Sequence, residues 1–166
     1  MDSPRRRFLL GGTTMAALAL VRGGSEASAS LNLSGADFEV MLSDEEWRER
    51  LEPDAYAVLR EEATEHPFSS PLNAEVRAGT YSCGGCALPV FESSTKFNAG
   101  TGWPSFSAPI TESVLETPDT SLEMIRTAVY CRRCGGHLGH VFEDGPRPTG
   151  LRYCINGVAL SFKAKA

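Results

Sequence analysis

Residues 131–157, "CRRCGGHLGHVFEDGPRPTGLRYCING", bring together a Cys-x-x-Cys pair, two of the three histidines and the last of the five cysteines. A second pair, "CGGC", stands upstream at residues 83–86. Each pair offers two thiolates, and two such pairs complete a closed tetrahedral site of the kind that holds structural zinc. The sequence therefore predicts one Zn²⁺ held by four cysteines: Cys83, Cys86, Cys131 and Cys134.

Two other interpretations of the pairs remain open. Disulfides are common in exported proteins, and a thioredoxin-like motif also uses Cys-x-x-Cys, although neither pair has the required βαβ context. The zinc interpretation is favoured by glycines that allow a tight knuckle, Gly84, Gly85, Gly135 and Gly136. A closed four-cysteine site stabilises a fold rather than carrying out chemistry, so we expect the metal to lie away from any reaction.

Cys154 is left over once the two pairs are assigned. A free cysteine is among the most often buried residue types, so a buried spectator is one interpretation. Its neighbours favour a reactive thiol, because Arg152 and Asn156 lie two residues before and after it and would share its face of a strand. Cations and histidines lower the pKa of a thiol, and His137 and His140 are close in sequence. A row of cation, thiol and amide indicates a catalytic strand.

The rest of the chain predicts short helices followed by many short strands. "SDEEW" places Glu46 three residues after Ser43, a capping box that opens a helix, and Pro53 opens a second helix with Tyr56 and Leu59 facing inward. The β-prone runs that follow are "TYSC", "LPVF", "TAVYC", "HVFED" and "RYCINGVALSF", and the alternation in "VALSF" predicts a half-buried strand. We predict a mainly antiparallel β domain over residues 43–166.

The N-terminus is typical of an export signal. Arg5, Arg6 and Arg7 precede an apolar stretch over residues 8–21, and "ASA" at residues 27–29 is a small-residue cleavage site. "RRRFL" also resembles a twin-arginine signal, which addresses folded proteins for export. We therefore expect a signal peptide over residues 1–29, a linker over residues 30–42 and a mature protein outside a bacterial cytoplasm. An uncleaved membrane anchor is the alternative, although the apolar stretch is shorter than the roughly 20 residues of a membrane span.

The charge of the chain argues against a nucleic-acid partner. The formal net charge is -5, and the basic residues of the signal region make the remainder more acidic still. Nucleic-acid binding requires clustered Lys and Arg, and we see no basic stripe beyond the N-terminus.

Several long motifs resemble the methionine-R-sulfoxide reductases of the B type. The motifs are "CGGC", "KFNAGTGWPSF", "CRRCGGHLGHVFEDGPRPTGLRYCING" and the leading "LSDEEWRERLEPDAYAVLREEATEHPFSSPL". The resemblance covers about residues 38 to 164. It implies two small antiparallel sheets with helices at the N-terminal side and a structural zinc on the four paired cysteines. It also implies that Cys154 attacks the sulfur of the R epimer of methionine sulfoxide.

The same resemblance implies roles for the neighbouring side chains. His137 and His140 would bind and protonate the sulfoxide oxygen. Trp103 and Phe142 would form the apolar wall that holds the methyl group of the substrate. Arg152 would lower the pKa of Cys154, and Asn156 would orient a water or a histidine. Two alternatives remain: Trp103 could be part of the core, and His137 could be structural.

Thr101 stands where many family members carry a second, resolving cysteine. Because the other cysteines are assigned to zinc, we expect no internal disulfide in the reaction, and the sulfenic acid on Cys154 would be reduced by a thioredoxin-like or small thiol. A non-catalytic, zinc-stapled binding module and a thiol peroxidase are the competing hypotheses.

Overall fold

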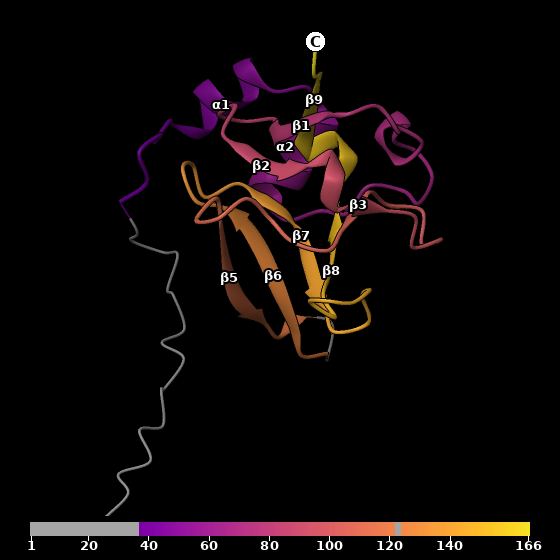
Figure 1. Cartoon of the computed structure of the whole chain (residues 1–166). Helices are drawn as coiled ribbons and strands as arrows, with labels where there is room; N and C mark the ends of the chain where they lie inside the picture. Colours follow the sequence, from indigo (N-terminus) through magenta and orange to yellow (C-terminus); the bar gives the residue numbers. More distant parts are fainter. Residues whose placement is uncertain (1–36, 122–123) are drawn as a thin grey trace, which may run out of the picture.

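A computed structural model of the chain describes residues 37–121 and 124–166. The predicted signal, residues 1–29, and the first part of the predicted linker lie outside the described residues. Within the described part, none of the helices is both long enough and apolar enough to cross a membrane. The fold is mainly β, with two antiparallel sheets and short helices (Figure 1), so the predicted fold class is confirmed.

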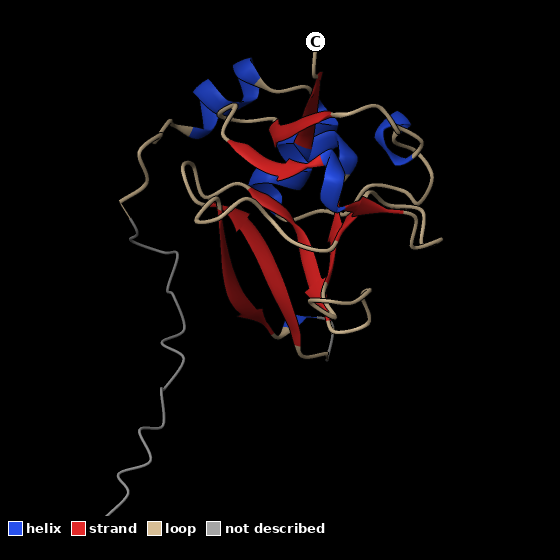
Figure 2. Cartoon of the chain, viewed as in Figure 1, coloured by secondary structure: helices blue, strands red, loops and turns tan. Residues whose placement is uncertain are grey.

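The strands form one sheet of three and one of six, ordered β2-β1-β9 and β3-β4-β8-β7-β6-β5. Their bounds are β1 Gly79–Cys83, β2 Pro89–Glu92, β3 Lys96–Phe97, β4 Ser105–Phe106, β5 Val114–Asp119, β6 Arg126–Cys131, β7 His137–Phe142, β8 Arg152–Ile155 and β9 Leu160–Ala164. The described helices are α1 Asp44–Arg50, α2 Pro53–Glu61, and the 3₁₀ helices η1 Pro71–Asn73, η2 Ser93–Thr95 and η4 Gly157–Ala159. In Figure 2 the helices α1 and α2 lie at the end of the molecule that holds the small sheet, while β5, β6 and β7 extend away from it.

Both predicted helix starts are confirmed. Ser43 and Glu46 form a reciprocal capping box: the Ser43 N–H donates to the Glu46 carboxylate at 2.7 Å, and the Glu46 N–H donates to the Ser43 hydroxyl at 3.3 Å. Pro53 occupies the first turn of α2, where its missing N–H costs nothing. Tyr56 and Leu59 of α2 are buried, as the sequence predicted.

The core lies between the two sheets and is rich in aromatic rings. Phe91 stacks on Phe106 with ring centroids 4.4 Å apart, and Tyr81 meets Phe106 edge-on at 5.0 Å. Tyr153 of β8 packs on Phe91 from the larger sheet. Because Tyr153 faces this core, the adjacent Cys154 must face the opposite side of the sheet.

The predicted strand "RYCINGVALSF" is interrupted, which corrects the expectation for two residues. The strand β8 ends at Ile155, so Asn156 lies just beyond it, and Val158 belongs to η4 rather than to β9. The carboxylate of Glu65 accepts the N–H groups of Gly157 at 2.5 Å and Val158 at 3.1 Å, which stabilises a turn that alternation alone does not predict. The chain passes here from the large sheet to the small one.

The end of the predicted linker is anchored to the body of the protein. The Val40 N–H donates to the Arg133 carbonyl at 3.0 Å. The ring of Phe38 fills the space where a side chain at Gly135 would project. Residues 37–42 therefore pack on the turn that carries the second cysteine pair.

Candidate functional site

The four paired cysteines converge in one buried cluster. Their sulfur atoms all lie within 4.8 Å of one another, with Cys83 Sγ 3.7 Å from Cys134 Sγ and Cys86 Sγ 3.5 Å from Cys131 Sγ. Zinc–sulfur bonds of about 2.3 Å in a tetrahedron would separate the sulfurs by about 3.8 Å. The donor set therefore fits a tetrahedral metal ion, and no disulfide links any of the described cysteines.

Each cysteine pair forms a tight knuckle at the end of a strand. The Cys83 N–H donates to the Leu88 carbonyl, and the Cys131 N–H donates to the Gly136 carbonyl, both at 2.8 Å. The residue after each pair has a positive φ, 61° at Ala87 and 67° at Gly135. Of the four glycines predicted to allow tight knuckles, only Gly135 takes a left-handed conformation.

Cys154 lies on β8, inside the six-stranded sheet. It is paired with Ser105 of β4 on one side and with His140 of β7 on the other. Directly paired residues in an antiparallel sheet place their side chains on the same face, about 5 Å apart at Cβ. The sheet therefore brings the thiol and the imidazole of His140 side by side.

The Cys154 thiol is partly buried, and burial raises its pKa above the ordinary value. Arg152 and the Thr101 hydroxyl both oppose that rise, as expected for Arg152, but they do not overcome it. The direction expected for Arg152, a lowering of the pKa of Cys154, is present, but burial of the thiol is the larger effect. The hydroxyl oxygen of Thr101 is buried and has no hydrogen-bond partner in the described structure, so it lies beside the thiol without a formed bond.

A β-bulge places His137 and His140 on the same face. Residues three apart on a regular strand point to opposite faces, but β7 has one extra residue, Leu138, between the pairs Val129–Gly139 and Tyr130–His137. The two imidazole rings consequently meet edge-on with centroids 5.3 Å apart. Gly139 comes directly after the bulged residue. A Cβ at this position would collide with the Cys154 carbonyl, so β7 and β8 can approach this closely only with glycine there.

The two histidines differ in their surroundings. His137 is 2% exposed, and neither ring nitrogen has a partner among the described residues. Burial, with a contribution from His140, lowers the pKa of His137 to about 4, so its ring is neutral near pH 7. The Nε2 atom of His140, in contrast, lies 2.8 Å from Oδ2 of Asp119.

A pocket of about 150 Å³ opens in front of Cys154. A cavity of this size can hold a group as large as benzene. Five predicted residues line it, Trp103, His140, Phe142, Cys154 and Asn156, together with Thr64, Arg126 and Gly139. Neither His137 nor Arg152 belongs to this lining, and none of the four clustered cysteines does. The cysteine cluster and the pocket therefore share no lining residue.

Two aromatic side chains form the apolar part of the pocket. Trp103 is only half-buried, which sets it apart from core aromatics, and its indole N–H donates to the Glu65 carbonyl at 3.1 Å. The guanidinium of Arg152 lies over the Phe142 ring, 4.5 Å from its centroid. Arg152 also pairs with Asp144, with Nε 2.8 Å from Oδ1. Arg152 thus supports Phe142 from behind.

Asn156 is bound to backbone on both sides of its amide. Its Oδ1 accepts from the Glu65 N–H at 3.0 Å, and its Nδ2 donates to the Leu138 carbonyl at 3.1 Å. Because oxygen and nitrogen are both occupied, the amide joins the bulge of β7 to the segment before Trp103. The amide keeps a second N–H and a second lone pair, so its predicted role in orienting a water or a histidine stays a prediction.

Sequence reasoning missed four residues of this site. Asp119 and Arg126 face each other as a cross-strand pair between β5 and β6, and a search for opposite charges at the ends of a hairpin could have found them. Thr64 and Glu65 come from the segment after α2, and no pattern in the sequence links them to Cys154. Thr64 and Glu65 come near Cys154 only because segments far apart in the sequence pack together in the fold.

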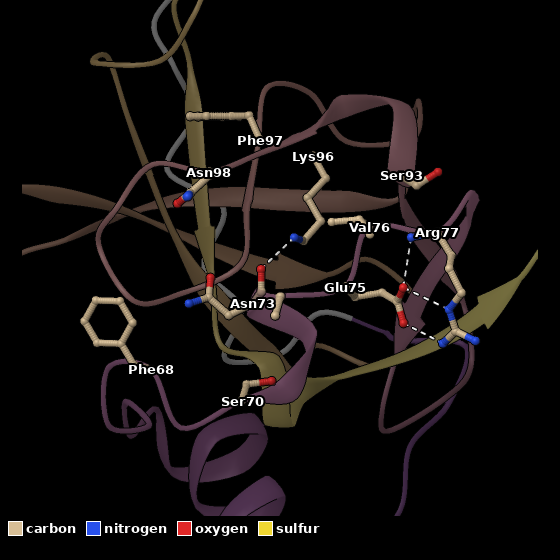
Figure 3. Close-up of a pocket in the computed structure, with 11 residues that line it drawn as sticks. Phe68, Ser70, Asn73, Glu75, Val76, Arg77, Ser93, Lys96, Phe97 and Asn98 are labelled. Carbon is tan, nitrogen blue, oxygen red and sulfur yellow. Dashed lines mark hydrogen bonds and ion pairs between the residues drawn. The ribbon is translucent and has the colours of Figure 1, made fainter.

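A larger cavity, of about 650 Å³, lies at the β3 edge of the large sheet (Figure 3). Lys96 points across it and donates to the Asn73 carbonyl at 2.9 Å, while Glu75 is paired with Arg77. None of its lining residues is a cysteine or a histidine. The smaller pocket, which holds the thiol, is therefore the candidate active site.

Comparison with known proteins agrees with this assignment. A family model described as the SelR domain matches residues 51–164. The peptide methionine sulfoxide reductase MsrB of Pseudomonas putida W619 is 60% identical over 122 residues, covering 73% of this chain and 92% of the relative. The protein of the same name from Bradyrhizobium diazoefficiens is 58% identical over 130 residues, 78% of this chain and 94% of the relative. That from Leptospira interrogans is 48% identical over 128 residues, 76% of this chain and 98% of the relative. The chain therefore belongs to the SelR-domain family of MsrB-type peptide methionine sulfoxide reductases.

Proposed function

We propose that this enzyme reduces the R epimer of methionine sulfoxide in proteins and peptides to methionine. The observation that carries the proposal is the position of Cys154 in a pocket of about 150 Å³, between an apolar wall and the imidazole of His140. Trp103 and Phe142 would hold the methyl group of the substrate. The sulfoxide oxygen would then face His140, with the sulfur in front of the thiol.

The first step transfers oxygen from the substrate to the enzyme. The Cys154 sulfur attacks the sulfoxide sulfur, the oxygen is protonated, and the oxygen ends on Cys154 as a sulfenic acid while methionine leaves. One thiol and one sulfoxide thus become one sulfenic acid and one thioether, and the atoms balance. Because burial raises the pKa of Cys154, the resting group is a thiol, and the proton that it loses on attack replaces the one that the departing oxygen takes up.

We assign the role of proton donor to His140 rather than to both histidines. A ring with a pKa of about 4, as in His137, holds no proton to give near neutral pH. His137 is also absent from the pocket lining, whereas His140 is part of it. His137 would then support the ring of His140 through their edge-on contact.

The sulfenic acid on Cys154 would be reduced by external thiols. Two thiols give one disulfide and water, and return the cysteine to its reduced state. The other four cysteines are held in the metal cluster, and Thr101 lies beside Cys154 at the position of a resolving cysteine. A thioredoxin-like protein or a small thiol therefore fits as reductant. Mass spectrometry after one turnover without reductant should show no internal disulfide.

We propose that the cysteine cluster holds one Zn²⁺ with a structural role. Four sulfur donors in a closed, buried tetrahedron are the ligand set that zinc prefers for such sites. The metal would tie the turn after β1 to the turn after β6. Zinc content measured on the purified protein should approach one ion per chain, and another metal at this stoichiometry would contradict the proposal.

We also propose that the enzyme acts outside the cytoplasm of a bacterium. The proposal is supported by the arginine-rich start, apolar stretch and small-residue cleavage site in residues 1–29. N-terminal sequencing of the secreted form should find a start near Ser30. A start at Met1 or Asp2 would contradict it.

The central experiment uses peptides that carry separated R and S epimers of methionine sulfoxide. Activity on the R epimer alone supports the proposal, and activity on the S epimer overturns it. Cys154→Ser should keep the metal and the fold yet lose all activity. If the wild type reduces peroxide but not the peptide, the protein is a thiol peroxidase, and if it reduces neither, it is a binding module.

A further inference from the structure

We infer that Asp119 is a positioning residue that fixes the tautomer of His140, so that Nδ1 is the atom that delivers the proton to the sulfoxide oxygen. The inference rests on the proposed function and adds a residue to it. Asp119 ends β5, two strands from β7, and reaches across β6 to His140. Its distance from the ring nitrogen, 2.8 Å, is that of a charge-assisted hydrogen bond.

The carboxylate of Asp119 is held from three directions. Its Oδ2 accepts from Arg126 at 2.6 Å as well as from His140, and its Oδ1 accepts the Ser121 N–H at 2.8 Å. Arg126 also donates to the Ser121 hydroxyl at 3.0 Å, so the three residues brace one another. The side chain of Asp119 is only 17% exposed. This is a built arrangement rather than an exposed ion pair.

Asp119 is ionised at every pH at which the enzyme would work. Burial by itself raises the pKa of a carboxyl group, but hydrogen bonds from Ser121 and His140, with the charge of Arg126, outweigh it and hold the pKa of Asp119 well below its ordinary value. An ionised carboxylate only accepts hydrogen bonds. The His140 Nε2 atom must therefore carry the hydrogen in both the neutral and the protonated ring.

The other ring nitrogen is then free for the reaction. In the neutral ring Nδ1 has a lone pair, and in the protonated ring it becomes a donor. The Nδ1 atom of His140 has no hydrogen-bond partner in residues 37–121 and 124–166, nor is it sealed from solvent. His140 lines the pocket beside Cys154. The structure thus leaves one proton-transfer atom on the substrate side.

The charged and titratable groups around His140 come from four strands. Asp119 from β5 supplies the negative charge, and Arg126 from β6 is bound to the same oxygen. His137 on β7 itself stays neutral at working pH. Cys154 from β8 is a thiol at rest. Among these groups, the Asp119 carboxylate is the one that accepts a hydrogen bond from the ring, so its removal should leave the tautomer of His140 unfixed.

The test replaces the carboxylate by an amide of the same shape. Asp119→Asn should lower kcat by about 100-fold, because a positioned general acid contributes about 10²–10⁴-fold. KM for the R-sulfoxide peptide should change by less than about threefold, since the pocket wall is untouched. The neutral ring of His140 in this variant should no longer be held as the Nε2–H tautomer alone, which ¹⁵N NMR measures. Asp119→Glu should recover part of the loss.

Glu116→Gln is the matched control. Glu116 lies on the same strand as Asp119 and also accepts a hydrogen bond, from the Tyr153 hydroxyl at 2.8 Å, but has no contact with His140. It should keep kcat within about threefold and leave the tautomer of His140 unchanged. If Asp119→Asn behaves like this control, or loses activity with the tautomer unchanged, the inference is wrong. If the wild type itself does not reduce the peptide, the proposed function fails instead.

A measurement on the wild type removes any dependence on how the variant folds. The chain has three histidines, so the ring nitrogens can be assigned by ¹⁵N NMR. The neutral form of His140 should be the Nε2–H tautomer alone. An Nδ1–H tautomer, or a mixture, would overturn the inference.

Discussion

The buried, neutral ring of His137 should make the stability of this protein depend on pH in a defined window. Burial lowers the pKa of His137 from 6.5 to about 4 in the folded state. The unfolded chain therefore binds a proton first as pH falls, so stability is complete above the unfolded pKa and is lost as pH falls through the window toward the folded pKa. The perturbation to apply is acidification.

The size of the effect follows from the shift. Each pKa unit corresponds to about 1.4 kcal/mol, so the full window represents on the order of 3 kcal/mol. Between about pH 7 and about pH 5, the free energy of unfolding should fall by about 2 kcal/mol from this group alone. The carboxylates whose pKa values are depressed, Asp119, Glu75 and Asp144, contribute only at lower pH.

The assay is urea unfolding at a series of pH values, with zinc present throughout. His137→Gln has no ionisable group at this position but keeps the same cysteine cluster, so the difference between the two proteins isolates the histidine. The wild type should lose about 2 kcal/mol more than the variant over this range. Parallel curves for the two proteins would refute the assignment of a buried neutral ring.

Three further outcomes follow from the site. Thr101→Cys should convert the enzyme to one that forms an internal disulfide with Cys154 after turnover, seen by mass spectrometry, because the two side chains adjoin. Glu65→Ala should lower the free energy of unfolding by about 2–4 kcal/mol in urea, since two backbone N–H groups lose their acceptor. Cys134→Ser should lose the metal, measured by elemental analysis, and unfold at lower temperature than Cys154→Ser, which leaves all four ligands intact.

The features predicted correctly depend on interactions between residues that are close in the sequence. The Cys-x-x-Cys spacing identified the metal cluster because a knuckle places both sulfurs within a few bonds of one turn. The capping box at Ser43 and the proline at the start of α2 act within one helical turn and were found for the same reason. Cys154 could be singled out because the other four cysteines fall into two closely spaced pairs.

The features that were missed depend on register between distant segments. The bulge at Leu138 changes which face of the sheet the side chains beyond it point to. Nothing in the amino-acid composition of this segment predicts a bulge. Asn156 was expected in a strand, but its amide is bound to Glu65, far away in sequence. Asp119 reaches His140 only because three strands pair in one register.

The position of β8 inside the large sheet determines how Cys154 and a reducing thiol could meet in the proposed reaction. Its backbone is hydrogen-bonded to β4 and to β7 on either side, so the strand that carries Cys154 is held in place. In the proposed reaction the reducing thiol would therefore have to reach the sulfur inside the pocket of about 150 Å³. The rate of reduction by different thiols would then depend on their access to the pocket rather than on their reducing power. A cysteine exposed at the tip of a narrow loop would reduce Cys154, whereas an equally reducing thiol in a recess of its own protein would not.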